Sequence, residues 1–222
     1  MKIKVCGMRN RENLSILLAL KPDFVGFIFY DKSKRFVEDF PQIKFPKNVK
    51  KVGVFVNESV EEVLRKVKVF RLDCVQLHGN ESPEYCGKLA KMLTERSRSD
   101  NSNEVISTLL NHQIEIIKAF SVDESFDFNT TNAYEDICNY FLFDTRGKDY
   151  GGNGIKFNWE ILQNYNGKTP FLLSGGISKL DAEEIKKINH KYFQGVDVNS
   201  GFEIEPGLKN INDIEEFKKN LK

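Results

Sequence analysis

Eight short apolar runs recur along this chain, and segments with helical periodicity follow many of them. Runs of three to six residues rich in Val, Ile and Phe are typical of strands that are buried on both faces. Strands that alternate with helices predict a parallel sheet, because each crossover helix returns the chain to the edge where the next strand begins. The runs are 3–5, 24–29, 52–56, 72–77, 114–119, 140–143, 171–173 and 195–198.

Apolar residues spaced three and four positions apart predict the helices between these runs. Leu14, Leu17 and Leu18 share one helical face after the first run, and further helical patterns cover 60–67, 159–162, 182–188 and 211–221. Ser82 and Pro83 supply a cap and a first-turn proline for the helix after the fourth run. Eight such units in 222 residues predict a single-domain (β/α)8 barrel over 1–222. An open doubly wound sheet is the alternative fold.

One segment interrupts this regular pattern. Residues 94–103 are rich in Ser, Asn, Arg, Asp and Glu and offer almost nothing apolar to bury. We therefore predict an exposed surface insertion here, between the fourth helix and the fifth strand. In a barrel this connection lies on the face opposite the active site.

The charge balance excludes several classes of partner. Lys and Arg number 33 against 32 Asp and Glu, so the net charge of +1 provides no global field for nucleic acid or an acidic membrane. Residues 1–9 lack the apolar core of a signal peptide, and no apolar stretch approaches the roughly 20 residues that span a bilayer. A cytoplasmic protein is predicted.

The four cysteines are widely spaced, without the spacing of zinc ligands, so no structural metal is expected.

Two reactive side chains follow apolar runs directly. Cys6 follows the first run, and Asp144 follows the sixth. The carboxyl ends of barrel strands share one face, which is where barrel enzymes carry their active sites. Cys6 would otherwise be a small buried core residue, and Asp144 a helix cap or a loop-ordering carboxylate. Their predicted placement at one mouth favours a catalytic role for both.

The last two strands are followed by segments suited to phosphate. Gly175 and Gly176 follow the seventh run, and Asn199 and Ser200 follow the eighth. Both segments offer backbone amides without bulky side chains, and barrels often bind phosphate at this pair of loops. An isolated Gly-Gly would be only a turn.

A basic loop after the second run contains Arg35, whose guanidinium can hold a carboxylate by two parallel hydrogen bonds. The alternative is a solvated basic loop. A small-molecule ligand with a phosphate and a carboxylate is therefore predicted. Gln76 lies near the end of the fourth run and His78 follows it. Both could line the site, or His78 is a hydrogen-bonded structural histidine, and we place both outside the catalytic set.

Over nearly its whole length the chain resembles the phosphoribosylanthranilate isomerases, which are barrel enzymes of tryptophan biosynthesis. The resemblance implies that Cys6 is the general base, Asp144 the general acid and Arg35 the contact to the anthranilate carboxylate. It places the phosphate on Gly175, Gly176, Asn199 and Ser200. Asn199 departs from the serine more usual there, and 94–103 is longer than the family's usual connection. The matching segments, in family order, are 4–8, 25–29 with 33–35, 52–57, 75–79, 142–145, 150–152, 173–176 and 197–201.

The implied reaction is an Amadori rearrangement of N-(5-phosphoribosyl)anthranilate from an aminoaldose to an aminoketose. In it, Asp144 protonates the furanose ring oxygen, the ring opens to an iminium, and the Cys6 thiolate removes the proton from C2. The enolamine then relaxes to the ketone. Proton transfer of this kind requires no cofactor or metal ion, and none is expected.

Two other functions remain open on residues alone. Another phosphate-binding barrel is one, either indole-glycerol-phosphate synthase or the sugar-phosphate isomerase of histidine biosynthesis. The latter would favour aspartates at the ends of the first and fifth strands, where Cys6 and Lys118 stand. A non-catalytic barrel that senses a phosphorylated metabolite is the other. The oligomeric state is not predicted.

Overall fold

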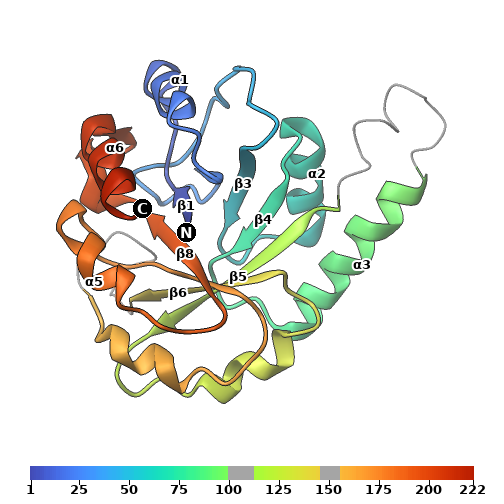
Figure 1. Cartoon of the computed structure of the whole chain (residues 1–222). Coiled ribbons are helices and arrows are strands. Elements are labelled where there is room, and N and C mark those ends of the chain that lie inside the picture. Colours follow the sequence, from blue (N-terminus) through green and yellow to red (C-terminus); the bar gives the residue numbers. More distant parts are fainter. Residues whose placement is uncertain (100–112, 146–155) are drawn as a thin grey trace.

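The structure is a computed structural model that describes residues 1–99, 113–145 and 156–222. Its centre is a closed barrel of eight parallel strands, in which each strand pairs with the next and β8 pairs with β1 (Figure 1). This confirms the predicted barrel over the open sheet. The strands are β1 (Lys2–Val5), β2 (Phe24–Ile28), β3 (Lys50–Phe55), β4 (Cys74–Leu77), β5 (Glu115–Val122), β6 (Tyr140–Thr145), β7 (Phe171–Leu173) and β8 (Phe193–Val198).

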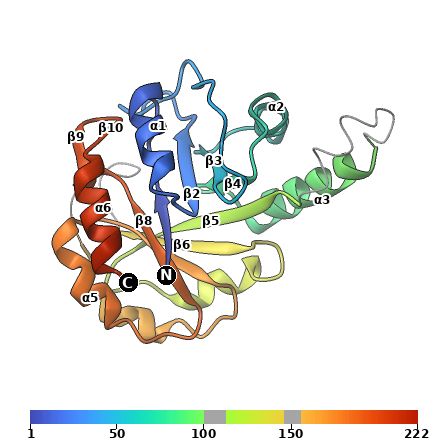
Figure 2. The same cartoon turned by 45° about the horizontal axis from the view of Figure 1, so that its top comes forward.

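Helices surround the strands, and both termini lie near β1 and β8 (Figures 1 and 2). The side chain of Asn10 accepts a hydrogen bond from the Asn13 backbone N–H and so caps the first helix. Ser59 caps the second helix in the same way, through the N–H of Glu62. The α-helices are α1 (Arg11–Ala19), α2 (Val60–Phe70), α3 (Pro83–Ser99), α5 (Ala182–Lys186) and α6 (Ile211–Asn220).

Three connections depart from the predicted strand-helix pattern. No α-helix forms between β2 and β3, where residues 29–49 are all described. Pro41 and Pro46 disfavour a helix there because each lacks a backbone donor. Phe40 and Phe45 instead cover Phe27, with ring centroids 4.6 and 6.1 Å away.

After β5 and β6 the described chain forms only 3-10 helices, η1 (Phe128–Tyr134) and η2 (Trp159–Asn164). The sequence of η1, FNTTNAY, contains four Asn and Thr residues, which favour caps and turns over helix interiors. Shorter 3-10 segments are η3 (Lys179–Asp181) and η4 (Ser200–Phe202), and a hairpin of β9 (Glu203–Glu205) and β10 (Leu208–Lys209) follows η4.

The segment predicted as an exposed insertion begins inside a helix. α3 continues through residues 94–99, and residues 100–103 lie outside the described part of the chain. The Thr94 hydroxyl donates a hydrogen bond to the Ala90 carbonyl, 2.9 Å away, which accommodates this polar side chain within the helix. Figure 2 shows α3 extending away from the barrel.

The short apolar runs suggest a wholly apolar barrel interior, but the interior also contains charged residues. An apolar cluster fills much of it, including Phe24, Val52 and Ile117. Lys4 and Asp197 are nevertheless buried in β1 and β8. The sequence does not reveal Asp197 as the partner of Lys4, so a lysine between two apolar residues is interpreted as solvent-facing. This explains why an apolar interior is expected.

Outside the barrel strands, aromatic rings form much of the layer beneath the helices. Phe143 is fully buried, and its ring centroid lies 5.1 Å from that of Phe171 and 5.3 Å from those of Phe128 and Tyr165. Edge-to-face contacts of this kind add to the free energy gained by burying the rings. This cluster therefore packs β6 against β7 and against the segments that follow β5 and β6.

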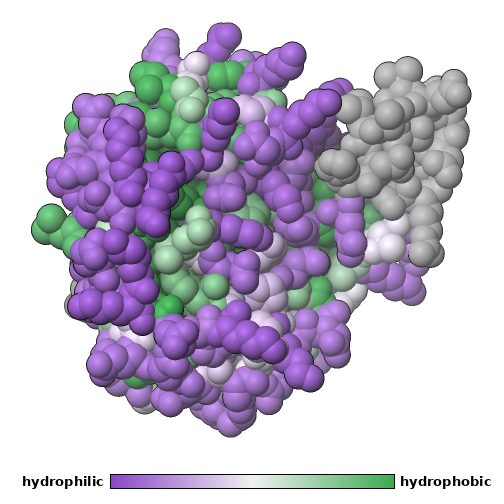
Figure 3. All heavy atoms as spheres, viewed as in Figure 1, coloured by the Kyte–Doolittle hydropathy of each residue, from purple (hydrophilic) through white to green (hydrophobic). Residues whose placement is uncertain are grey.

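The visible surface is largely hydrophilic, with separate apolar areas (Figure 3). Within residues 1–99, 113–145 and 156–222, no helix combines the length and apolar character needed to span a bilayer.

We predict that Phe143→Ala lowers the free energy of unfolding by about 3 to 5 kcal/mol, because it leaves a cavity among rings that cannot close around it. Chemical denaturation measures the change. Ile16→Ala on α1, where the side chain is 57% exposed, serves as the control and should change stability by less than about 0.5 kcal/mol. A loss below about 1 kcal/mol for Phe143→Ala would show that the aromatic layer repacks.

Candidate active site

A pocket opens at the carboxyl ends of the barrel strands. Residues from both ends of the chain line it, and all seven predicted site residues are among them. The fold thus brings together every residue that the sequence placed at this mouth. These seven are Cys6, Arg35, Asp144, Gly175, Gly176, Asn199 and Ser200.

Cys6 follows β1 directly, and its backbone N–H donates to the Val198 carbonyl, 2.9 Å away. Gly26 on the neighbouring strand leaves room for the thiol, because a Cβ there would lie 2.8 Å from the sulfur. Burial raises the pKa of the Cys6 thiol above its usual value, and the nearby Asp197 adds to this. The Lys4 and Lys209 ammonium groups act in the opposite direction.

Asp144 lies near the end of β6 and is 8% exposed. His78 approaches it from the end of β4, with Nε2 3.2 Å from Asp144 Oδ2. Gln76 lies behind the imidazole, with its amide nitrogen 2.7 Å from His78 Nδ1. When that amide donates to Nδ1, the ring proton resides on Nε2 and faces the carboxylate. We placed both residues outside the catalytic set, but His78 contacts the predicted acid and Gln76 contacts His78 in turn.

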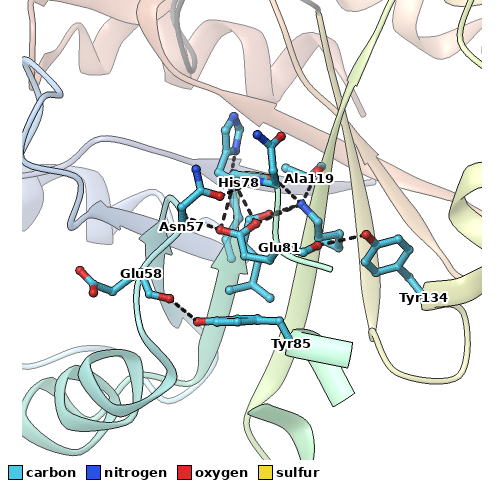
Figure 4. Close-up of polar contacts among 12 residues, drawn as sticks. Asn57, Glu58, His78, Glu81, Tyr85, Ala119 and Tyr134 are labelled. Carbon is cyan, nitrogen blue, oxygen red and sulfur yellow. Dashed lines mark hydrogen bonds and ion pairs between the residues drawn. The ribbon is translucent and has the colours of Figure 1, made fainter. Parts of the chain in front are cut away.

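A carboxylate under the His78 loop holds that loop in place (Figure 4). Glu81 accepts hydrogen bonds from the backbone N–H groups of Asn57 and Gly79, at 2.8 and 3.0 Å, and pairs with the Lys118 ammonium at 3.1 Å. Lys118 also donates to the Gly79 carbonyl, 2.7 Å away. The position that the alternative isomerase would fill with an aspartate thus serves here to fix the loop that carries His78.

Arg35 already has a protein partner. Its Nε lies 2.9 Å from Oε1 of Glu203, and its Nη2 lies 2.6 Å from Oε2. Glu203 also accepts from the buried Lys209 ammonium, 2.6 Å away. Burial opposes ionisation of Glu203, but Arg35 and Lys209 outweigh it and hold its pKa below the usual range. The sequence pointed to Arg35 but not to Glu203 or Lys209, because nothing in the local pattern indicates that the β9–β10 hairpin folds back over β1 and β2.

The two predicted phosphate loops pack against neighbouring backbone. Gly175 has φ +93°, and a Cβ there would lie 2.1 Å from Thr145 Oγ1, so a larger residue would displace the loop. The Asn199 side chain accepts from Lys209 Nζ at 2.7 Å and is therefore directed toward β10. The Asn199 carbonyl also accepts from Lys209 Nζ, 3.2 Å away, so Lys209 anchors this loop of the pocket.

No three His, Cys, Asp or Glu side chains come together as a metal-ion site in the described ranges 1–99, 113–145 and 156–222. The four cysteines, Cys6, Cys74, Cys86 and Cys138, are all buried as free thiols.

A family model and the sequences of known relatives identify the same protein family. The family model described as N-(5'-phosphoribosyl)anthranilate (PRA) isomerase matches residues 3–105 and 98–220. The N-(5'-phosphoribosyl)anthranilate isomerase of Parabacteroides distasonis is 47% identical over 98% of this chain and 91% of its own length. The corresponding protein of Phocaeicola vulgatus is 41% identical, over 100% of this chain and 98% of its own.

Solved structures agree with the sequence comparison. Phosphoribosyl anthranilate isomerase from Thermotoga maritima matches with a TM-score of 0.80 at 32% identity, covering 100% of this chain and 98% of that one. A phosphoribosyl anthranilate isomerase in complex with reduced 1-(o-carboxyphenylamino)-1-deoxyribulose 5-phosphate matches with a TM-score of 0.77 at 30% identity and the same coverage. The chain therefore belongs to the N-(5'-phosphoribosyl)anthranilate isomerase family.

Proposed function

We propose that this protein isomerises N-(5'-phosphoribosyl)anthranilate to 1-(2-carboxyphenylamino)-1-deoxyribulose 5-phosphate, as a step of tryptophan biosynthesis. The observation that carries the proposal is the convergence of Cys6 and Asp144 on one pocket that two glycine-containing loops and Arg35 also line. A relative of the same fold holds a reduced form of this product. A cytoplasmic location and the absence of a cofactor stay predictions.

In this reaction Asp144 is the general acid. Its proton goes to the furanose ring oxygen, the bond from C1 to that oxygen breaks, and the nitrogen lone pair forms the C1=N bond of an iminium. His78, 3.2 Å from Asp144 Oδ2, holds the carboxyl group in position from the side of β4. The opened sugar then carries a cationic nitrogen next to C2, which makes the C2 hydrogen acidic.

Cys6 is the general base. Its thiolate takes the C2 proton, and the electrons of the C–H bond form an enolamine. The enolamine gains a proton at C1 and loses the hydroxyl proton at C2, so the product is a ketose isomer of the substrate with no net redox change. The reaction thus needs a thiolate and a carboxylic acid in the same pocket.

Arg35 is the contact for the anthranilate carboxylate. Glu203 occupies the Nε side of the guanidinium. The outer end, with Nη1 and the second Nη2 proton, still presents two parallel N–H bonds to a substrate carboxylate. Glu203 and Lys209 therefore orient Arg35 rather than replace its ligand. The phosphate is assigned to the backbone amides of the loops that contain Gly175, Gly176, Asn199 and Ser200.

We predict that Cys6→Ala and Asp144→Asn each lower kcat by a factor of about 10² to 10⁴ with little change in substrate affinity, because each removes one proton-transfer group. Following the loss of N-(5'-phosphoribosyl)anthranilate measures the rate. Cys74→Ala and Asp136→Asn are controls that remove a second interior thiol and an exposed carboxylate, and both should retain turnover. Near-normal kcat in the Cys6 or Asp144 variant would remove that residue from the mechanism.

For Arg35→Ala we expect KM to rise about 10- to 100-fold with a smaller change in kcat, since a charge-assisted contact contributes about 1.5 to 3 kcal/mol. Steady-state kinetics separates the two constants. Lys34→Ala removes an exposed cation from the same loop and should leave KM unchanged. Unchanged kinetics for Arg35→Ala would assign the carboxylate to another group.

A further inference from the structure

Lys4 is a fully buried cation in the interior of the barrel. It lies on β1 two residues before Cys6, so both side chains project to the same face of the strand. Cys6 belongs to the apolar cluster that fills the barrel. A lysine in such a place is rare, because burying an ammonium group without compensation is costly.

Asp197 is the ion-pair partner that offsets part of the cost of burying the Lys4 ammonium group. It stands opposite Lys4 in the register that joins β1 to β8, and its Oδ1 lies 2.9 Å from Lys4 Nζ. Asp197 is itself only 5% exposed. The pair therefore sits across the seam at which the barrel closes, with both charges out of water.

The Cys6 sulfur is the second partner of Lys4. The two side chains lie two residues apart on the same inner face of β1, so the Lys4 ammonium acts electrostatically on the sulfur. An ammonium group has three donors, so it can serve Asp197 and Cys6 at once. Burial lowers the pKa of Lys4, but Asp197 and Cys6 outweigh this and raise it above its usual value, so Lys4 stays charged at neutral pH.

We propose that Lys4 is a positioning residue whose buried ammonium group, held by Asp197, donates to the Cys6 sulfur and stabilises the thiolate form of the catalytic base. A pair that served only to close the barrel would not need to lie beside the thiol on the inner face of β1. Buried ion pairs are in any case weak contributors to stability, and apolar residues of similar volume often replace them without loss. The contact to the sulfur is what an apolar pair could not reproduce. This inference rests on the proposed function in taking Cys6 as the base.

The other charged groups around the thiol are accounted for by their own partners. Lys209 acts on Cys6 from β10 but is paired with Glu203 at 2.6 Å. Asp144 and His78 act on Asp197 from β6 and β4, with opposite signs. Burial and Asp197 both raise the pKa of the thiol, and the largest opposing influence is Lys4.

The test measures ionisation of the thiol in the absence of substrate. Iodoacetamide alkylates the thiolate, and peptide mass spectrometry reads Cys6 separately from the other three cysteines. For Lys4→Met we expect alkylation of Cys6 near pH 7 to slow by about tenfold or more, since an opposite charge in contact shifts a pKa by roughly 1 to 3 units. The rates of variant and parent should converge as the pH rises. The pH at which kcat/KM rises should shift upward by the same amount.

Two further variants make the result specific. Lys2→Met removes a cation from the same face of β1, one layer lower, where its partner is the Tyr140 hydroxyl, and should leave Cys6 alkylation unchanged. The double variant Lys4→Met with Asp197→Asn removes both buried charges. It should still slow alkylation of Cys6, but by less than the single variant, because the charge of Asp197 that raises the thiol pKa is removed as well. It keeps the test available if an unpaired Asp197 prevents folding.

An alkylation profile that is unchanged in Lys4→Met would overturn the proposal. A uniform slowing at every pH would also overturn it, because that result indicates a displaced thiol and not a less ionised one. Failure of the proposed function is a separate outcome. If Cys6→Ala retains turnover, Cys6 is not the base, whatever the alkylation of the Lys4 variant shows.

Discussion

The pairing of β8 with β1 is the constraint on which the site depends. It closes the barrel in a register that sets Lys4 opposite Asp197 and Val5 opposite Val198. The residues after these strands therefore emerge beside each other, so that Cys6 lies next to the loop that follows β8. A slip of one residue would turn the Lys4 side chain out of the barrel and Cys6 away from the pocket, because successive side chains of a strand point to opposite faces.

Three buried ion pairs hold segments of the pocket in place in the same way. Each joins a lysine to a carboxylate, and each lies directly behind a side chain or loop that lines the mouth. Pairs of this kind fix direction more than they add stability, since desolvation offsets much of their attraction. The segments that they hold are those of Cys6, Arg35 and His78. The pairs themselves are Lys4 with Asp197, Lys209 with Glu203 and Lys118 with Glu81.

Sequence patterns located the strands and the mouth for a simple reason. A short run of Val, Ile and Phe marks a buried strand, and parallel strands in a closed barrel share one end, so Cys6 and Asp144 could be brought together without coordinates. The ion pairs could not be found in this way. Lys4 and Asp197 are separated by 193 positions, and Lys4 between Ile3 and Val5 resembles an ordinary solvent-facing residue of a strand. The connection from β2 to β3 was missed because its prolines and aromatic residues replace a helix by direct ring packing.

The charges of the substrate explain why the cations are distributed as they are. The proposed substrate brings a phosphate and a carboxylate to a pocket in which a thiolate must also form. Three anions close together in a water-poor site would repel one another and return the thiol to its neutral form. In the proposed function, Arg35 binds the carboxylate and the loops after β7 and β8 bind the phosphate, so neither charge of the substrate requires Lys4. In our proposal the Lys4 ammonium, which Asp197 holds beside Cys6, therefore acts on the thiolate and not on the charges of the ligand.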